Sequence, residues 1–144
     1  MPFGANDGSI VDVAKGTLRR LMSFQGQCGK PNYMSPEVVL NMEPFDGFAA
    51  DLWACGIILF IMLVGLPPFA IAHRKDARFQ MITKGHLLSM LNQWNRPVGC
   101  EAGDLLQKML QEDPRERLSV VEVLNHPWVI HNCSPGSIRS VEHI

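Results

Sequence analysis

Several sequence signals that would assign a catalytic or binding function are missing from this chain. It has no G-x-x-x-x-G-K-[ST] phosphate loop, no G-x-G-x-x-G turn, no H-E-x-x-H zinc pair and no G-x-S-x-G nucleophile turn. Its four cysteines form no C-x-x-C pair, which argues against a zinc site or a redox motif and favours reduced thiols in a cytoplasmic protein. We therefore expect no metal ligands.

An excess of charge of one sign is also lacking. The 13 lysines and arginines nearly balance the 14 acidic residues, so the formal net charge is −1. This balance gives no electrostatic case for binding nucleic acid or a membrane surface. The first residues show no basic start followed by an apolar run, so no secretory signal is expected. The 144 residues, 47% of them hydrophobic, are enough for one domain, or part of one, with a real core.

The longest apolar stretch runs from Ala49 to Phe69. A helix that is apolar on nearly every side must be buried, in a protein core or in lipid. Residues 52–64 span about 20 Å as a helix, which is short of the roughly 30 Å of a bilayer core, and the following G-L-P-P stops the helix. We predict a buried central core helix opened by Asp51, with Cys55 inside the core. A transmembrane span is the alternative, because apolar residues continue through Ala72.

Helical spacing of apolar residues dominates the rest of the chain. It predicts helices over residues 79–85, 87–94 and 101–112, and a short helix from Pro36 with Ser35 as a candidate cap. Ser119 and Glu122 form a capping-box pattern, after which Val120, Val123 and Leu124 should face the core. For His126 a packed or capping role is expected rather than catalysis. Residues 11–22 suit one short helix or strand, and no convincing pair of strands is visible, so the predicted class is all-α.

Four spaced segments together resemble one family. G-K-P-N-Y-M-S-P-E (29–37) resembles the G-T-P-x-Y-M-A-P-E end of the activation segment of Ser/Thr protein kinases. D-L-W-A-C-G (51–56) resembles the D-x-W-S-x-G start of the kinase F helix, and L-P-P-F (66–69) the turn after it. D-P-R-E-R (113–117) and L-N-H-P-W (124–128) resemble the close of the last kinase helices. The order and gaps of these segments identify residues 28–129 as a kinase C-terminal lobe fragment.

The resemblance implies a fold and a division of the chain. The fold is a partial kinase C-lobe around the buried central helix. Residues 1–27 then correspond to a flexible, activation-loop-like segment and residues 130–144 to a loose tail. The family phosphorylates proteins with ATP and magnesium, neither of which is expected as a cofactor of this chain alone.

The resemblance also implies roles for individual residues. Glu37 matches the acidic residue of the A-P-E motif, and Arg117 matches the arginine that pairs with it. Asp51 matches the aspartate that holds the catalytic loop, and Ile58 and Met62 match supports of the hydrophobic spines. Structural roles also follow for the other signature residues, Trp53 and Gly56.

The same resemblance places substrate contacts. Gly29, Lys30, Pro31 and Tyr33 match the loop that receives the substrate residue after the phosphorylated one. The helix near residues 79–85 matches helix G, a docking surface for a protein substrate or partner. Thr17 and Ser23 lie where an activation-loop phosphosite would be, although ordinary loop hydroxyls are the alternative.

The departures from the family are as informative as the matches. The chain lacks H-R-D-x-x-x-x-N, the Gly-rich loop and the V-A-I-K lysine, and Lys30 replaces the usual threonine. No residue here is therefore expected to be catalytic, and the fragment should be inactive alone.

Three hypotheses stay open. The first is a kinase fragment, whether a truncated gene model, a split product or a degraded copy. The second is a non-catalytic, pseudokinase-like binding module, and the third is a small membrane protein. With part of the cover of the central helix missing, an exposed apolar patch of several hundred Å² is expected.

Overall fold

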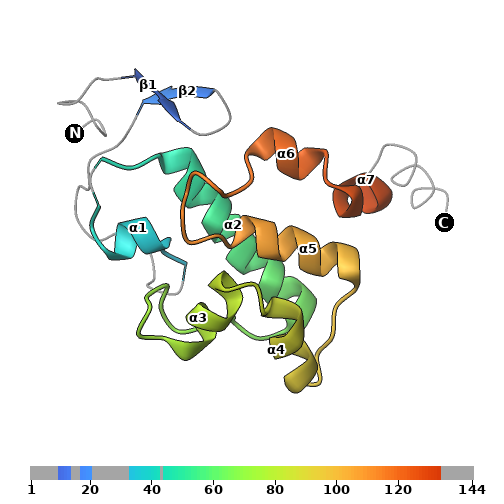
Figure 1. Ribbon diagram of the computed structural model, residues 1–144. Coiled ribbons are helices and arrows are strands. Elements are labelled where there is room, and N and C mark those ends of the chain that lie inside the picture. Colours follow the sequence, from blue (N-terminus) through green and yellow to red (C-terminus); the bar gives the residue numbers. More distant parts are fainter. Residues whose placement is uncertain (1–9, 14–16, 21–32, 43, 134–144) are drawn as a thin grey trace.

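Seven helices and one short strand pair make up the part of the chain that the computed structural model describes (Figure 1). Residues 33–42 and 44–132 are described in full, and residues 10–13, 17–20 and 133 by their backbone. The elements in chain order are β1 (Ile10–Val13), β2 (Thr17–Arg20), α1 (Pro36–Val39), α2 (Gly47–Val64), α3 (Ala77–Thr83), α4 (Leu87–Gln93), α5 (Cys100–Met109), α6 (Val120–Leu124) and α7 (Pro127–Cys133).

The central helix α2 begins earlier than predicted. Its cap is Asp46, whose side chain accepts a hydrogen bond of 3.0 Å from the N–H of Phe48. Asp51 is the fifth residue of the helix and is exposed, so the prediction that it opens the helix was wrong. The helix ends at Gly65, whose φ of 89° suits a residue without a side chain. Two prolines follow and prevent its continuation.

One face of α2 forms the main core. Trp53, Ile57, Phe60 and Val64 recur every three or four residues and are at most 5% exposed. They pack against buried side chains from the segment after α2 and from α3, α4 and α5: Phe69, Ala72, Phe79, Ile82, Leu87, Met90, Leu91, Leu106 and Leu110. The predicted all-α, partial C-lobe around a buried central helix is confirmed in this part of the chain.

Helix α5 lies across α2 at close range (Figure 1). A methyl group placed on Gly56 would lie 2.9 Å from Leu110 Cδ2 and 3.2 Å from Met109 Cβ. Only hydrogen fits between the two helices at this point, so the glycine sets how closely they pack. The predicted structural role of Gly56 therefore has a physical basis in this helix crossing.

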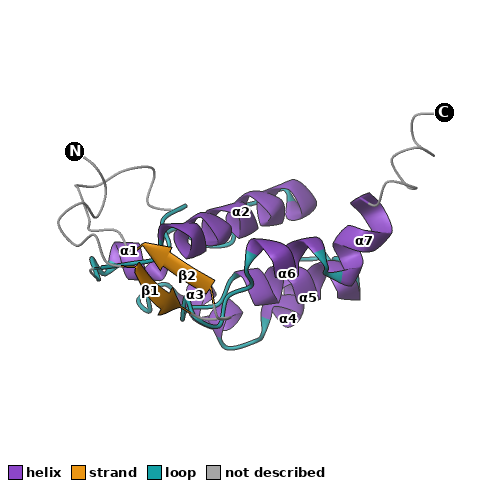
Figure 2. Cartoon of the chain, turned by 90° about the horizontal axis from the view of Figure 1, so that it is seen from above, coloured by secondary structure: helices purple, strands orange, loops and turns teal. Residues whose placement is uncertain are grey.

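The other face of α2 is open. Figure 2 shows α2 along the upper edge of the helical body, with α3, α4, α5 and α6 below it. Ile58 is 47% exposed and Met62 75%, and Cys55 is exposed, so the prediction of a buried Cys55 was wrong. The sequence could not distinguish the two faces, because α2 is apolar on both.

The C-terminal helices differ from the predictions in two places. The capping box is present, since Ser119 and Glu122 each accept a hydrogen bond from the other's backbone N–H. Val123 packs into a second, smaller core, but Val120 and Leu124 are 47% and 62% exposed, so their predicted burial was wrong. Helix α6 has only five residues, too few for its apolar positions to fix one inward face.

The chain outside the main helical body also holds regular structure. Strands β1 and β2 pair antiparallel with Val13 opposite Thr17, where the sequence showed no convincing strand pair. Helix α7 extends through residues 130–133, the start of the segment expected to be a loose tail, whose remainder lies outside the described residues. His126 has the expected capping role, because its Nδ1 accepts a hydrogen bond of 3.1 Å from the N–H of Trp128.

Candidate functional site: the ion pair and the open face of α2

The buried ion pair of Glu37 and Arg117 joins α1 to the segment between α5 and α6. Glu37 is the second residue of α1, after a proline that suits the first turn of a helix. Its two carboxylate oxygens accept hydrogen bonds of 2.9 and 3.0 Å from the guanidinium of Arg117, 80 residues away. The side chains are 4% and 0% exposed. The predicted pairing is confirmed, in the two-bond geometry that carboxylates and guanidinium groups favour.

The remaining donors of Arg117 also have partners. Its guanidinium donates to the carbonyl of Ala49 at 2.8 Å and to the carbonyl of Gln111 at 2.9 and 3.1 Å. It also lies 5.1 Å from the ring centre of Trp53. A buried charge is tolerated only when it is paired and hydrogen-bonded, and this one is both. Arg117 thereby connects α1, the first turn of α2 and the segment after α5.

Two buried polar atoms near this pair lack partners among the described residues: the hydroxyl of Ser35 and the indole nitrogen of Trp53. Ser35 occupies the cap position of α1, but its side chain makes no capping bond, so the predicted cap was wrong. It is 1% exposed. A buried hydroxyl without a partner costs about 1–3 kcal/mol of desolvation.

We expect the substitution Ser35→Ala to raise the free energy of unfolding by about 1 kcal/mol, because it removes that unpartnered hydroxyl. The matched control is Ser119→Ala, in which the lost hydroxyl caps α6, and here we expect a loss of about 1 kcal/mol. Urea unfolding followed by circular dichroism measures both. Equal losses for the two variants would show that Ser35 has a partner after all.

The open face of α2 carries the residue matched to the support of the catalytic loop, Asp51, and the two matched to supports of the hydrophobic spines, Ile58 and Met62. Asp51, Ile58 and Met62 are all exposed, and their spacing of seven and four residues places them along one side of the helix. None of them contacts a catalytic loop, because these 144 residues contain no such motif. The face therefore combines one carboxylate with an apolar strip.

The remaining predicted site residues are only partly described. Tyr33 packs, partly buried, against the main core. Gly29, Lys30, Pro31 and Ser23 lie outside the described residues, and only the backbone of Thr17 is described, at the start of β2. Their expected substrate and phosphosite roles stay predictions.

A cavity of about 560 Å³, which the sequence did not predict, lies between α1, the loop before α3 and the loop after α5. Its walls come from three segments: residues 36–42, 72–74 and 112–114. No local pattern marks such a site, because it exists only where these segments meet.

ATP and magnesium, the cofactors of the family, are not expected for this chain alone. No group of three or more His, Cys, Asp or Glu side chains in the described part could hold a metal ion. The motifs that hold ATP in kinases are missing from the sequence, so no step of phosphate transfer can be assigned to these residues.

Among the described helices, one, α2, is long and apolar enough to cross a membrane by length and composition alone, with a mean hydropathy of 2.2. Core helices of soluble proteins can have the same length and composition. In this fold 39% of the helix is buried against the rest of the chain.

Comparison with known proteins identifies the lineage. The protein kinase domain model matches residues 11–129. Calcium-dependent protein kinase 15 of Oryza sativa subsp. japonica is 39% identical over 106 residues, which cover 74% of this chain and 19% of the relative. The delta subunit of calcium/calmodulin-dependent protein kinase type II of Oryctolagus cuniculus is 42% identical over 113 residues, 78% of this chain and 20% of the relative. The chain spans about a fifth of the length of these relatives, and it belongs to the protein kinase domain family.

Proposed function

We propose that this chain is the substrate-side part of a Ser/Thr protein kinase catalytic domain and that these 144 residues alone neither bind ATP nor transfer phosphate. The observation that supports this most directly is the open face of α2. Asp51, which matches the support of the catalytic loop, and Ile58 and Met62, which match supports of the hydrophobic spines, are exposed together. The buried pair of Glu37 and Arg117, in contrast, is complete.

We expect another protein segment to cover the open face of α2 in a whole kinase domain. Apolar surface in water costs roughly 25 cal/mol per Å², and Ile58 and Met62 on this face of α2 are 47% and 75% exposed. A strip of this kind on a soluble protein indicates an interaction surface or an aggregation hazard. In a whole kinase domain the catalytic loop and its neighbours supply this cover, so the proposed function explains why the strip is exposed here.

A phosphate-transfer assay tests the proposal directly. The purified chain is incubated with radiolabelled ATP, magnesium and a mixture of basic and acidic protein substrates. We expect no incorporation above the level without enzyme. Transfer by the chain alone, in a preparation shown by mass spectrometry to be free of other kinases, would overturn the proposal.

Dye binding tests the open face independently of activity. We expect Met62→Gln, at a position that is 75% exposed, to reduce the fluorescence of a bound hydrophobic dye without lowering the unfolding midpoint. The matched control is Val121→Asn on α6, which is 67% exposed but lies outside the strip and should change dye binding little. Equal effects of the two substitutions would argue against a continuous strip on α2.

A second candidate function is a non-catalytic, pseudokinase-like binding module. The cavity between α1 and the loop before α3 favours it, because a binding site there needs neither ATP nor a catalytic loop. The partner would be a protein, bound through residues 28–33 and the α3 face, in the cytoplasm and without nucleic acid or membrane. Partition of the expressed chain into detergent rather than the aqueous phase would instead favour the small membrane protein.

A further inference from the structure

The cavity beside α1 has the size and lining of a site for a side chain of a partner. Its volume of about 560 Å³ is within the usual range for ligand pockets. Apolar atoms of Pro36, Leu40, Met42, Ala72 and Pro114 form much of its wall. Leu40 and Met42 are 52% and 55% exposed, so the apolar wall is open to solvent.

The acidic groups of the wall are already engaged. Glu37 is bound to Arg117. Glu112 accepts hydrogen bonds of 2.9 and 3.4 Å from Arg74, and Asp113 accepts one of 2.9 Å from the N–H of Arg115. Two of the three carboxylates, Glu37 and Glu112, are therefore balanced by a guanidinium.

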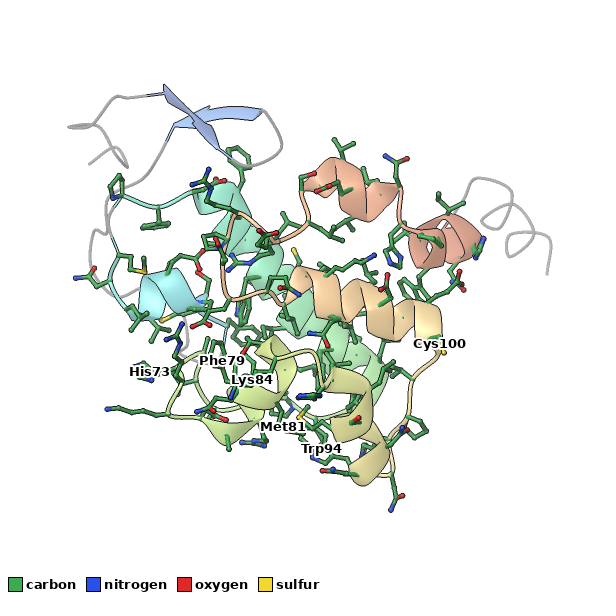
Figure 3. All side chains as sticks on the ribbon, in the orientation of Figure 1. His73, Phe79, Met81, Lys84, Trp94 and Cys100 are labelled. Atoms are coloured by element: carbon green, nitrogen blue, oxygen red, sulfur yellow. The ribbon has the colours of Figure 1, made fainter. Side chains whose placement is uncertain are left out.

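The rim formed by the loop before α3 is positively charged. Residues 70–78, the loop before α3 and its first two residues, contain Arg74, Lys75 and Arg78 but a single acidic residue, Asp76. Partial burial raises the pKa of Asp76, but hydrogen bonds from four backbone N–H groups outweigh it and hold that pKa below its usual value. This carboxylate is thus occupied in capping α3. In Figure 3, His73 lies on this loop, between α1 and α3.

Arg74 can bind a second carboxylate. Its side chain is 79% exposed, and its Nε and Nη2 are bound to Glu112. A guanidinium has five N–H donors, so a carboxylate from a bound segment can reach Arg74 while the pair with Glu112 stays in place. Lys75 and Arg78, both exposed, follow Arg74 within four residues of sequence and add positive charge next to this wall of the cavity.

We propose that this cavity docks a protein segment in which an apolar side chain lies beside acidic residues. The apolar side chain fills the space lined by Leu40, Met42 and Ala72, and the acidic residues contact Arg74, Lys75 and Arg78. This inference rests on the proposed function, because the substrate-side part of a kinase domain is the part that contacts protein substrates. Its test is a binding measurement that requires no phosphate transfer. A failure of the docking proposal can therefore be distinguished from a failure of the proposed function.

The test is fluorescence anisotropy with the full chain and a fluorescein-labelled peptide of about ten residues, one leucine flanked by aspartates, at low and moderate salt. We expect saturable binding that weakens with salt. Replacing the peptide's leucine by serine, or its aspartates by lysines, should reduce affinity at least about tenfold. Absence of saturable binding, or equal binding of the lysine peptide, would overturn the proposal.

Variants of the chain locate the site. Arg78→Glu and Leu40→Asp, both at exposed positions, should each weaken binding of the aspartate–leucine peptide about tenfold. The matched control is Lys108→Glu, the same kind of charge reversal on α5, whose lysine pairs with Asp104 away from the cavity and should leave the affinity unchanged. Unfolding midpoints measured on each variant separate lost binding from lost folding. Binding that is insensitive to Arg78→Glu and Leu40→Asp, or equally weakened by Lys108→Glu, would overturn the assignment.

Discussion

The substitution Arg117→Met is expected to lower the free energy of unfolding by about 3–5 kcal/mol. It leaves the carboxylate of Glu37 buried, at 4% exposure, without its partner, and removes the donors to the carbonyls of Ala49 and Gln111. A domain of this size is stable by only about 5–15 kcal/mol. A loss of this size removes a large share of the stability, and urea unfolding followed by circular dichroism measures it.

The control for this result is Arg74→Met. Arg74 also pairs with a glutamate at 2.9 Å, but it is 79% exposed. We expect no resolvable shift of the unfolding midpoint, because solvent screens the exposed pair. Equal shifts for Arg74→Met and Arg117→Met would mean that burial does not set the strength of these pairs.

A double variant separates the pair from its surroundings. Glu37→Met combined with Arg117→Met removes both charges, so neither is left buried alone. We expect it to be less destabilised than the sum of the two single variants, since replacing a whole buried pair by apolar groups is often nearly neutral. If the destabilisation of the double variant equals the sum of the two single variants, the loss in Arg117→Met comes from its contacts with the carbonyls of Ala49 and Gln111 rather than from its pairing with Glu37.

The substitution Phe79→Ala is the second large effect, with an expected loss of about 3–5 kcal/mol. Phe79 is fully buried, with its ring centre 5.5 Å from Phe69 and 6.1 Å from Trp53. Truncation leaves a cavity at the contact of α3 with α2 and removes both ring contacts. Thermal and urea unfolding of the variant measure the loss.

The matched control for Phe79→Ala is Met62→Ala on the open face of α2. Met62 is 75% exposed. We expect a loss below about 1 kcal/mol. A loss as large as that of Phe79→Ala would show that the exposed strip on α2 contributes to the stability of the chain itself.

The helices were largely predictable because their signals are local. The apolar spacing of residues 101–112, the capping box at Ser119 and the prolines after Gly65 each act within a few residues. The start of α2 was misplaced because two aspartates, Asp46 and Asp51, are both suitable caps by type. Only the backbone geometry distinguishes them: Asp46 is extended, with φ −84° and ψ 108°.

The candidate site was predictable in part and for a different reason. The resemblance to kinases pointed to the pairing of Glu37 with Arg117, 80 residues apart, which no propensity or periodicity indicates. The cavity beside α1 and the isolated hydroxyl of Ser35 were not predicted. Both depend on where distant segments meet, and a single sequence carries no local signal of that.

By itself, the sequence determined the lineage, the helical class and the missing ATP-binding and catalytic motifs, because motifs and periodicity are properties of order along the chain. Only the tertiary structure decided which side of α2 is covered, since that helix is apolar on all sides and burial depends on its neighbours. The same holds for the buried ion pair, whose strength comes from exclusion of water by α1, α2 and the segment after α5.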